Sequence, residues 1–104
     1  MTKKRQLRQL LERTGPTLVG GVHDGLSAAL AERAGFDALW ASGFAISASK
    51  RLADVGLVTM SEHLSATREI DRASDLPVVA DVDDGFGDAV IVTRMVRELS
   101  LIHI

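Results

Sequence analysis

The chain has 104 residues, 46% of them hydrophobic and 25% charged, which is typical of one small globular domain or of part of a larger one. Its formal net charge of −2 gives no sign of the basic surface that binds nucleic acid or anionic membranes. The sequence has no cysteine, so neither a disulfide framework nor a thiolate metal site is possible.

The first sixteen residues predict a helix and a break. Leu7, Leu10 and Leu11 recur at spacings of three and four within residues 3–13, and a Gly-Pro pair ends the pattern at 15–16. This basic start lacks the apolar core of a signal peptide, and no later run approaches the length of a membrane span. We therefore expect a cytoplasmic protein with no membrane partner.

The next segment predicts the first strand and its helix. TLVGGV, residues 17–22, is short and apolar, as a buried strand would be. Residues 25–35 have the pattern of an amphipathic helix closed by a glycine. Its apolar face is expected to carry Leu26, Ala29 and Leu30.

The middle of the chain predicts a second strand, a loop and a longer helix. FDALWAS, residues 36–42, is the strand. Residues 43–58 are small and mixed without a clean period, so we expect mostly loop, with at most one helical turn. The helix over 59–74 opens with Thr59 and Glu62 in a Thr-x-x-Glu capping box.

The last segment predicts a third strand and helix. LPVVAD, residues 76–81, is continuously apolar until its end, like a strand buried on both faces. Residues 88–99 form the helix, with Asp88 as its N-terminal cap. This pattern runs without a stop signal into an apolar tail, 100–104, which we expect to be a strand cut short or foreign sequence following a lost reading frame.

The order of elements, a helix and then three strand–helix units, favours an α/β fold with a parallel sheet. Three strands cannot close a barrel, and an open sheet of three would expose much apolar surface. We therefore expect one partial domain over 1–104. It consists of the helix and break at 1–16, the strand–helix units at 17–99 and the tail at 100–104.

Carboxylates crowd the end of the third strand, in VVADVDDGFGDA. In α/β folds the chemistry gathers at the carboxyl ends of the strands. Asp81 and Asp83 are two residues apart and would point to the same side if the strand continued. Two like charges are costly unless one is protonated or a cation lies between them, and Mg²⁺ prefers such oxygen ligands. The alternative is an acidic turn in which Asp83 or Asp84 bonds to the backbone.

Other polar residues have simpler interpretations. His23 and Asp24 follow the first strand as a possible polar pair, although Asp24 is better placed as a helix cap. His63 lies on a predicted helix and is expected to be solvated. Trp40 is typical of a core residue, and Asp54 is typical of a solvent-facing charge in a loop.

Three stretches together resemble the isocitrate lyase/phosphoenolpyruvate mutase superfamily: GVHDGLSAALAERAGFDALWASGFAISAS, LADVGLVTM and PVVADVDDGFGDA. A Trp-x-Ser-Gly pattern, followed about forty residues later by Asp-x-Asp-x-Gly-Phe-Gly, carries most of the likeness, which extends over residues 17–99. The chain looks most like the phosphoenolpyruvate phosphomutase and phosphonopyruvate hydrolase branch. The resemblance implies the N-terminal portion, about three strand–helix units, of a (β/α)₈ barrel.

The resemblance also implies roles for individual residues. Asp81 and Asp83 match the aspartates that bind Mg²⁺ directly or through water. Asp54 matches an acidic residue on a mobile loop that closes over the substrate, and it is the predicted catalytic residue. Asp84 departs from the family's usual Thr or Ala, which could alter metal affinity. The segment that lines the substrate pocket matches Trp40, Ser42, Gly43 and Phe44.

The implied enzyme uses Mg²⁺ and makes or breaks a C–P bond through a pyruvate enolate, acting on a 2-oxo acid or phosphonate. One alternative is a C–C lyase of the same superfamily, similar to methylisocitrate lyase or acting on oxaloacetate, with a cysteine-containing loop expected beyond residue 104. Another is an inactive fragment that serves as a binding or assembly module through its exposed strand edge. Family members are commonly homo-oligomers, and we expect the 104-residue chain alone to be catalytically inert.

Overall fold

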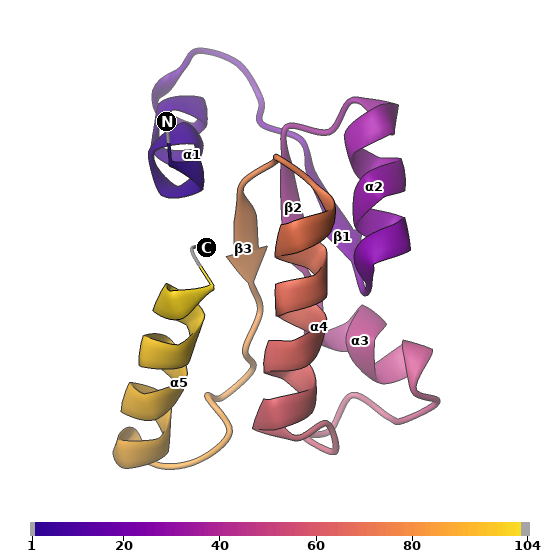
Figure 1. Cartoon of the computed structure of the whole chain (residues 1–104), viewed down its shortest axis with the longest axis vertical. Coiled ribbons are helices and arrows are strands. Elements are labelled where there is room, and N and C mark those ends of the chain that lie inside the picture. The colour runs from indigo at the N-terminus through magenta and orange to yellow at the C-terminus, as the bar shows by residue number, and fades with distance from the viewer. Residues whose placement is uncertain (1, 103–104) are drawn as a thin grey trace.

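A computed structural model describes residues 2–102 as three short parallel strands with helices around them (Figure 1). The predicted order of elements is confirmed, with one additional helix between the second and third strands. In chain order the elements are α1 (Lys3–Glu12), β1 (Val19–Val22), α2 (Gly25–Ala34), β2 (Ala38–Ala41), α3 (Gly43–Ser49), α4 (Met60–Ala73), β3 (Val78–Ala80) and α5 (Ala89–Leu101).

The sheet has the order β1-β2-β3 and is parallel throughout. Its register pairs Gly21 with Trp40 and Trp40 with Val79. The carboxyl ends of all three strands therefore meet at one edge of the sheet, the lower edge in Figure 1. The helices α3, α4 and α5 begin on this side of the molecule.

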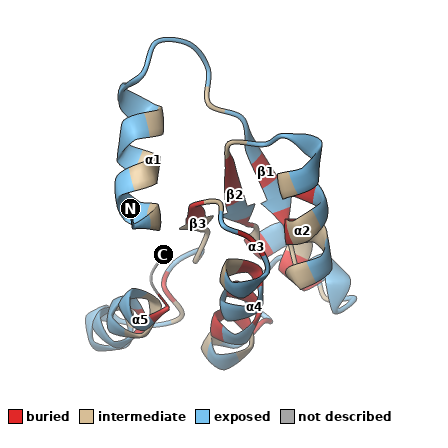
Figure 2. Cartoon of the chain, turned by 45° about the horizontal axis from the view of Figure 1, so that its top comes forward, coloured by how far each residue is buried: buried red, intermediate tan, exposed pale blue. Residues whose placement is uncertain are grey.

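The core lies between the sheet and the two helices α2 and α4, which pack against each other and against the strands. Figure 2 shows that the buried residues gather there, whereas α1 has none and α5 has only Met95. Side chains alternate between the faces of a strand, so Trp40 lies on the face opposite Leu39 and stays 40% exposed. The main core cluster consists of Val22, Ala28, Ala31, Leu39, Ala41, Ile70 and Val78.

Helix α2 buries a different face from the one predicted. Leu26 and Leu30 are exposed, while Ala28 and Ala31 are buried against the sheet and α4. Small residues allow this close approach: a Cβ on Gly25 would lie 3.4 Å from the Cβ of Ala73 in α4. The larger leucines would hold the two helices apart.

Helix α3 is longer than the single helical turn expected within residues 43–58, whereas residues 50–58 are loop as predicted. Residue 43 follows β2 after a single residue, and the Ser42 hydroxyl accepts a hydrogen bond from the Ala45 amide at 3.1 Å. This cap begins a helix of seven residues that buries Ile46 and Ser47. This helix is short and consists mostly of small residues, so the sequence showed no clear apolar period.

The helix caps predicted from sequence are confirmed. Thr59 and Glu62 form both hydrogen bonds of a capping box at the start of α4. Asp88 accepts from the amides of residues 90 and 91 at the start of α5. Gly35 ends α2 in the left-handed conformation, with φ of 95°.

The C-terminal residues that the structure describes continue α5. The helix extends through Leu101, and Ile102 caps it and is buried. The expectation that the tail begins a strand is therefore wrong for residues 100–102. His103 and Ile104, the remainder of that tail, lie outside the described residues. Within residues 2–102 no helix has the length and apolarity that crossing a bilayer requires.

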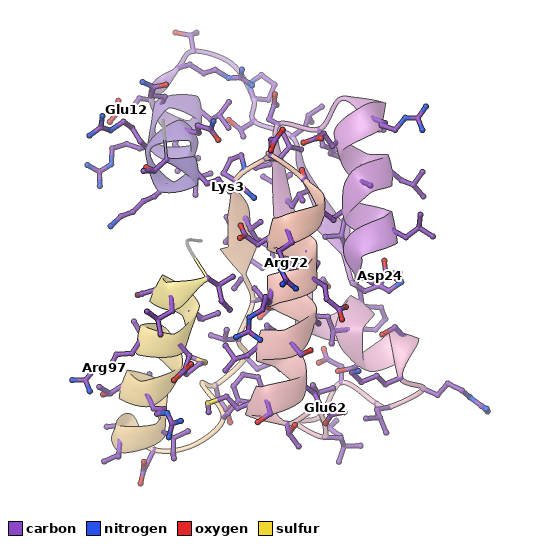
Figure 3. All side chains as sticks on the ribbon, viewed as in Figure 1. Lys3, Glu12, Asp24, Glu62, Arg72 and Arg97 are labelled. Carbon is purple, nitrogen blue, oxygen red and sulfur yellow. The ribbon has the colours of Figure 1, made fainter. Side chains whose placement is uncertain are left out.

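Helix α1 is attached to α4 mainly through Lys3, which extends from α1 toward α4 in Figure 3. Its ammonium group donates to the Asp71 carboxylate at 2.9 Å and to the carbonyl oxygens of Asp71 and Ser74 at 2.6 and 2.7 Å. Because Lys3 binds the C-terminal end of α4, α1 lies near the amino-terminal edge of the sheet, opposite the edge that carries the acidic residues. Glu62 and Asp24, labelled in Figure 3, mark the starts of α4 and α2 on the acidic side.

Candidate functional site

The loops after β2 and β3 lie side by side at the carboxyl edge of the sheet. The Ser42 amide donates to the Val22 carbonyl at 3.1 Å, and the Asp81 amide donates to the Ala41 carbonyl at 3.0 Å. The strand ladder therefore continues one residue beyond each strand. These bonds fix the backbone of Asp81 next to the start of α3.

The carboxylates of Asp81 and Asp83 meet at Gly43. The Gly43 amide donates to Asp81 Oδ2 at 3.3 Å. A Cβ placed on Gly43 would lie 3.0 Å from Asp83 Oδ1 and 3.3 Å from Asp81 Oδ2. The two carboxylates thus occupy the space that any larger residue at position 43 would fill, and three of the residues singled out from the sequence come together here. Their roles in binding stay predictions.

The loop from Asp81 to Asp88 is tightly wound. The Asp83 amide donates to Asp81 Oδ1 at 3.2 Å, and Asp83, Gly85 and Phe86 all have positive φ angles of 51°, 90° and 69°. Asp84 forms an Asx turn, because its carboxylate accepts from the Phe86 amide at 3.1 Å. The acidic-turn interpretation therefore describes the contact made by Asp84, whereas Asp83 instead directs its carboxylate toward Gly43.

The acidic cluster is short of positive charge. Partial removal from solvent raises the pKa of Asp83 above its ordinary value of 3.8, and the nearby carboxylates of Asp81, Asp54 and Asp84 raise it further, while His63 lowers it. No salt bridge in the described part of the chain involves any of these four carboxylates. A cation between Asp81 and Asp83 would relieve this repulsion.

The donor set fits a hard divalent ion such as Mg²⁺. Carboxylate oxygens are its preferred protein ligands, and Mg²⁺ usually keeps several water molecules while one or two carboxylates bind it. Within residues 2–102 no three His, Cys, Asp or Glu side chains are grouped closely enough to hold an ion by themselves. The described chain thus offers two carboxylates, a set that leaves coordination positions for water and substrate oxygens.

His63 is the functional candidate that sequence reasoning missed. It was expected to be solvated on its helix, but it is 1% exposed. Its Nε2 lies 2.5 Å from the carbonyl oxygen of Asp81, and its ring meets the Phe86 ring edge to face at 5.4 Å. The signal was available: His63 and Ile70 fall seven residues apart, on the face of α4 that packs against the sheet.

The other predicted site residues surround this cluster less closely. Trp40 is half exposed rather than fully in the core, and Phe44 is 66% exposed on the first turn of α3. The Ser42 hydroxyl is engaged as the cap of α3. Asp54 is exposed, yet its charge contributes to the raised pKa of Asp83, which places it near the cluster.

A hollow of about 570 Å³ adjoins the acidic loop. Its walls combine acidic and apolar side chains, so it could hold a small molecule with charged and uncharged parts. The segment after Asp54 lies directly across it from the loop after β3. The lining residues are Val55, Gly56, Val58, Thr59, Met60, Asp83, Asp84, Phe86 and Gly87.

The polar pair after β1 has a structural role. Asp24 accepts from the Ser27 amide at 2.8 Å and caps α2, as the sequence predicted. This bond and that of the Ser27 hydroxyl lower the pKa of Asp24. His23 Nε2 lies 3.4 Å from the Asp24 carboxylate. Neither residue contacts the Asp81 cluster in any hydrogen bond of the described chain.

Comparison with known proteins gives concordant results. A family model described as phosphoenolpyruvate phosphomutase matches residues 7–103. The 2-methylisocitrate lyase of Aeropyrum pernix is 46% identical over 93 residues, which cover 89% of this chain and 30% of the lyase. The crystal structure of a phosphoenolpyruvate phosphomutase from Streptomyces platensis subsp. rosaceus matches with a TM-score of 0.92 and 45% identity, over 96% of this chain and 35% of the other. A phosphonopyruvate hydrolase in complex with oxalate and Mg²⁺ matches with a TM-score of 0.94 and 39% identity, over 99% of this chain and 36% of the hydrolase.

The chain spans about a third of the length of these relatives. The predicted fold class, strand–helix units from an α/β barrel, is confirmed by this superposition. The relatives include a mutase, a hydrolase and a lyase, so similarity alone does not select one reaction. Since the family model matches nearly every residue, the chain belongs to the phosphoenolpyruvate phosphomutase family, within the phosphoenolpyruvate mutase/isocitrate lyase superfamily.

Proposed function

We propose that this chain carries the magnesium-binding and substrate-binding units of an enzyme that makes or breaks the C–P bond of a phosphonate beside a 2-oxo acid group. The observation that carries the proposal is the meeting of the Asp81 and Asp83 carboxylates at the backbone of Gly43. Similarity to a phosphoenolpyruvate phosphomutase and to a Mg²⁺-containing phosphonopyruvate hydrolase supports it.

Each residue has a distinct part in this proposal. Asp81 and Asp83 would hold Mg²⁺, which supplies positive charge next to the oxygen atoms on which negative charge develops as the bond to phosphorus breaks. Gly43 keeps the space beside the carboxylates open and orients Asp81 through its amide. Trp40 and Phe44 would provide apolar surface beside the substrate, while Ser42 fixes the start of α3.

Asp54 would act from the segment across the hollow. Its exposure leaves it free to approach a bound substrate, and its effect on the pKa of Asp83 indicates that it already lies near the acidic cluster. In a closed arrangement the segment 53–60 would exclude water from the hollow that it lines together with residues 83–87.

A second candidate is a C–C bond lyase acting on a 2-methylisocitrate-like acid. The 46% identity to the lyase of Aeropyrum pernix favours it. Both reactions would require the same metal and the same recognition of a carboxylate beside an oxygen-bearing carbon. They differ in the leaving group, which is a phosphoryl group in one case and a carbon acid in the other.

Binding to the 104-residue chain tests the proposal. Mn²⁺ is titrated into the chain, and free Mn²⁺ is followed by electron paramagnetic resonance, because Mn²⁺ accepts the same oxygen ligands as Mg²⁺. We expect saturable binding that Asp81→Asn abolishes, and tighter binding when oxalate is added. Absence of any Mn²⁺ binding would contradict the proposed metal site.

Competition then separates the two reactions. Phosphonopyruvate and 2-methylisocitrate are each used to displace oxalate from the Mn²⁺-loaded chain, with the fluorescence of Trp40, the single tryptophan, as the signal. We expect phosphonopyruvate to displace oxalate at the lower concentration. Stronger displacement by 2-methylisocitrate would instead support the C–C lyase.

A further inference from the structure

We infer that His63 is a positioning residue that holds the Asp81 loop in the geometry that brings the two carboxylates to Gly43. The inference rests on the proposed function only in treating Asp81 and Asp83 as the metal ligands. It gives a role to a buried polar side chain that lies on α4, outside the strand ends and loops that carry the site.

The contacts of His63 place a proton on Nε2. The carbonyl oxygen of Asp81 has no hydrogen to donate, so Nε2, at 2.5 Å, must carry the proton and donate it. The Thr67 hydroxyl lies 3.2 Å from the other ring nitrogen, Nδ1. The same hydroxyl donates to the His63 carbonyl at 2.8 Å, one turn back along α4.

The hydrogen bond from Nε2 restrains the backbone at Asp81, the first residue of the loop. Asp81 is held on its amide side by the bond to Ala41, and its carboxylate accepts from the amides of Gly43 and Asp83. The carbonyl of Asp81 is the one remaining polar group of this residue, and it accepts a hydrogen bond from Nε2 of His63. The peptide between residues 81 and 82 therefore cannot rotate without breaking a bond to a buried ring.

The ring also contacts the far end of the loop. Phe86, which has a φ of 69°, packs against the imidazole edge to face. His63 thus touches the loop at both residue 81 and residue 86, on either side of Asp83. One rigid side chain on α4 can in this way hold in place a segment that contains three residues with positive φ and two adjacent carboxylates. Groups that orient metal ligands in this manner typically change metal affinity about 10–100-fold when they are removed.

The test uses two amide substitutions that place their donor differently. In His63→Gln the side-chain amide can reach the position of Nε2 and donate to Asp81, whereas in His63→Asn it reaches only the position of Nδ1. Both remove the ring and its packing on Phe86, so a purely structural role would affect them alike. We expect H63Q to bind Mn²⁺ within about threefold of wild type and H63N to bind it about 10–100-fold more weakly.

A second readout does not depend on metal. The amide proton of Gly43 donates to the Asp81 carboxylate, so its chemical shift in the metal-free chain reports whether the loop is in place. We expect this resonance to move in H63N and to stay near its wild-type position in H63Q. If wild-type chain binds no Mn²⁺, the proposed metal site fails, but the Gly43 resonance still decides whether His63 positions the loop.

Equal Mn²⁺ affinity and equal Gly43 shifts in H63N and H63Q would overturn the inference. Should H63N fail to fold, Thr67→Val replaces it. This substitution keeps the side-chain shape and removes the partner of Nδ1. We then expect a smaller movement of the Gly43 resonance and a weakening of Mn²⁺ binding of about twofold to fivefold, below the range for complete removal of a supporting group. No change in either measurement would count against His63 as a positioning residue.

Discussion

The two loops that meet at the candidate site are built in opposite ways. After β2 the chain enters α3 through one residue, Ser42, and contributes small side chains and a backbone donor. After β3 it takes eight residues to reach α5, with three positive φ angles and four aspartates. Strained backbone and crowded like charges persist only where surrounding structure holds them, and they are most common at functional positions. The backbone of the short loop is therefore set by the neighbouring strands, whereas the conformation of the long loop depends on contacts with the surrounding structure.

Gly85 tests how much the long loop depends on its backbone conformation. Its φ is 90°, and a Cβ there would lie 2.5 Å from Cγ2 of Val92 in α5. Gly85→Ala therefore combines a left-handed conformation with a clash, and we expect a loss of about 2–3 kcal/mol. For a domain of this size that loss lowers Tm by roughly 10 °C or more, measured by circular dichroism.

Gly56→Ala is the matched control for this substitution. Gly56 has a φ of 79°, but a Cβ there would meet nothing within 4 Å. We expect its loss to be near 1 kcal/mol, that of the conformation alone. Equal losses at the two positions would mean that the contact with Val92 costs nothing.

The cap of α5 gives the next largest effect. Asp88 accepts hydrogen bonds from the amides of Val90 and Ile91 at 3.1 and 3.2 Å. Asp88→Ala should cost about 1 kcal/mol and lower Tm by roughly 4–8 °C. Asp88→Asn keeps the hydrogen bonds and should stay close to wild type in the same thermal melt. A loss as large in Asn as in Ala would assign the effect to charge rather than to capping.

Local features of both loops could be predicted from the sequence. The caps at Thr59 and Asp88 depend on residues three positions apart or fewer, and they are confirmed. The spacing of Asp81 and Asp83 predicted that both side chains point to one side if the strand continued. The strand ends at Ala80 and Asp83 has a φ of 51°, so a turn, not a strand, brings both carboxylates to Gly43. Both carboxylates reach Gly43 because β2 and β3 are neighbours in a parallel sheet. The order of strand–helix units had already favoured a parallel sheet.

Features that depend on packing between distant segments could not be read in the same way. Periodicity gave α2 an apolar face of leucines, but the face that packs is the one with alanines, since close approach to α4 requires small residues. The spacing of His63 from Ile70 placed it on the buried face of α4, but the sequence did not show which group its ring would meet there. That group is the Asp81 carbonyl, whose position is set by the pairing of Asp81 with Ala41 in β2.

Asp83→Asn tests whether the long loop stores unfavourable charge. The pKa of Asp83 is raised in the folded chain, so its ionised form is disfavoured there relative to the unfolded chain. Its contribution favours folding at low pH, where it is protonated, and is lost as pH rises through the folded pKa. Asp83→Asn should therefore raise Tm at pH 7 by a few degrees at most, because the residue is exposed and solvent screens the repulsion.

The gain should shrink as pH falls toward the ordinary Asp value of 3.8, where wild type is itself protonated. Asparagine also tolerates the left-handed conformation of residue 83, and that benefit would not vary with pH. Asp84→Asn is the control for removing one charge from the same loop. In the presence of Mg²⁺ the wild-type chain should have a higher Tm than Asp83→Asn, since bound metal stabilises only the chain that binds it. A Tm difference that is independent of both pH and Mg²⁺ would rule out stored charge repulsion.

Gly43→Ala tests whether the two carboxylates of the long loop can bind metal only when residue 43 has no side chain. It should have the smallest effect on stability. The new methyl group would lie 3.0 Å from Asp83 Oδ1 and 3.3 Å from Asp81 Oδ2. Asp83 is exposed and can turn away, and alanine favours the first turn of α3 by up to about 1 kcal/mol, so Tm should change little. The carboxylates could then no longer converge, and Mn²⁺ should bind roughly 10–100-fold more weakly.

Gly21→Ala makes the same change at the end of β1, where the nearest atom would be 3.9 Å away, and should leave Mn²⁺ affinity unchanged. If Gly43→Ala bound Mn²⁺ as wild type does, the space beside Gly43 could not be where the two carboxylates share an ion.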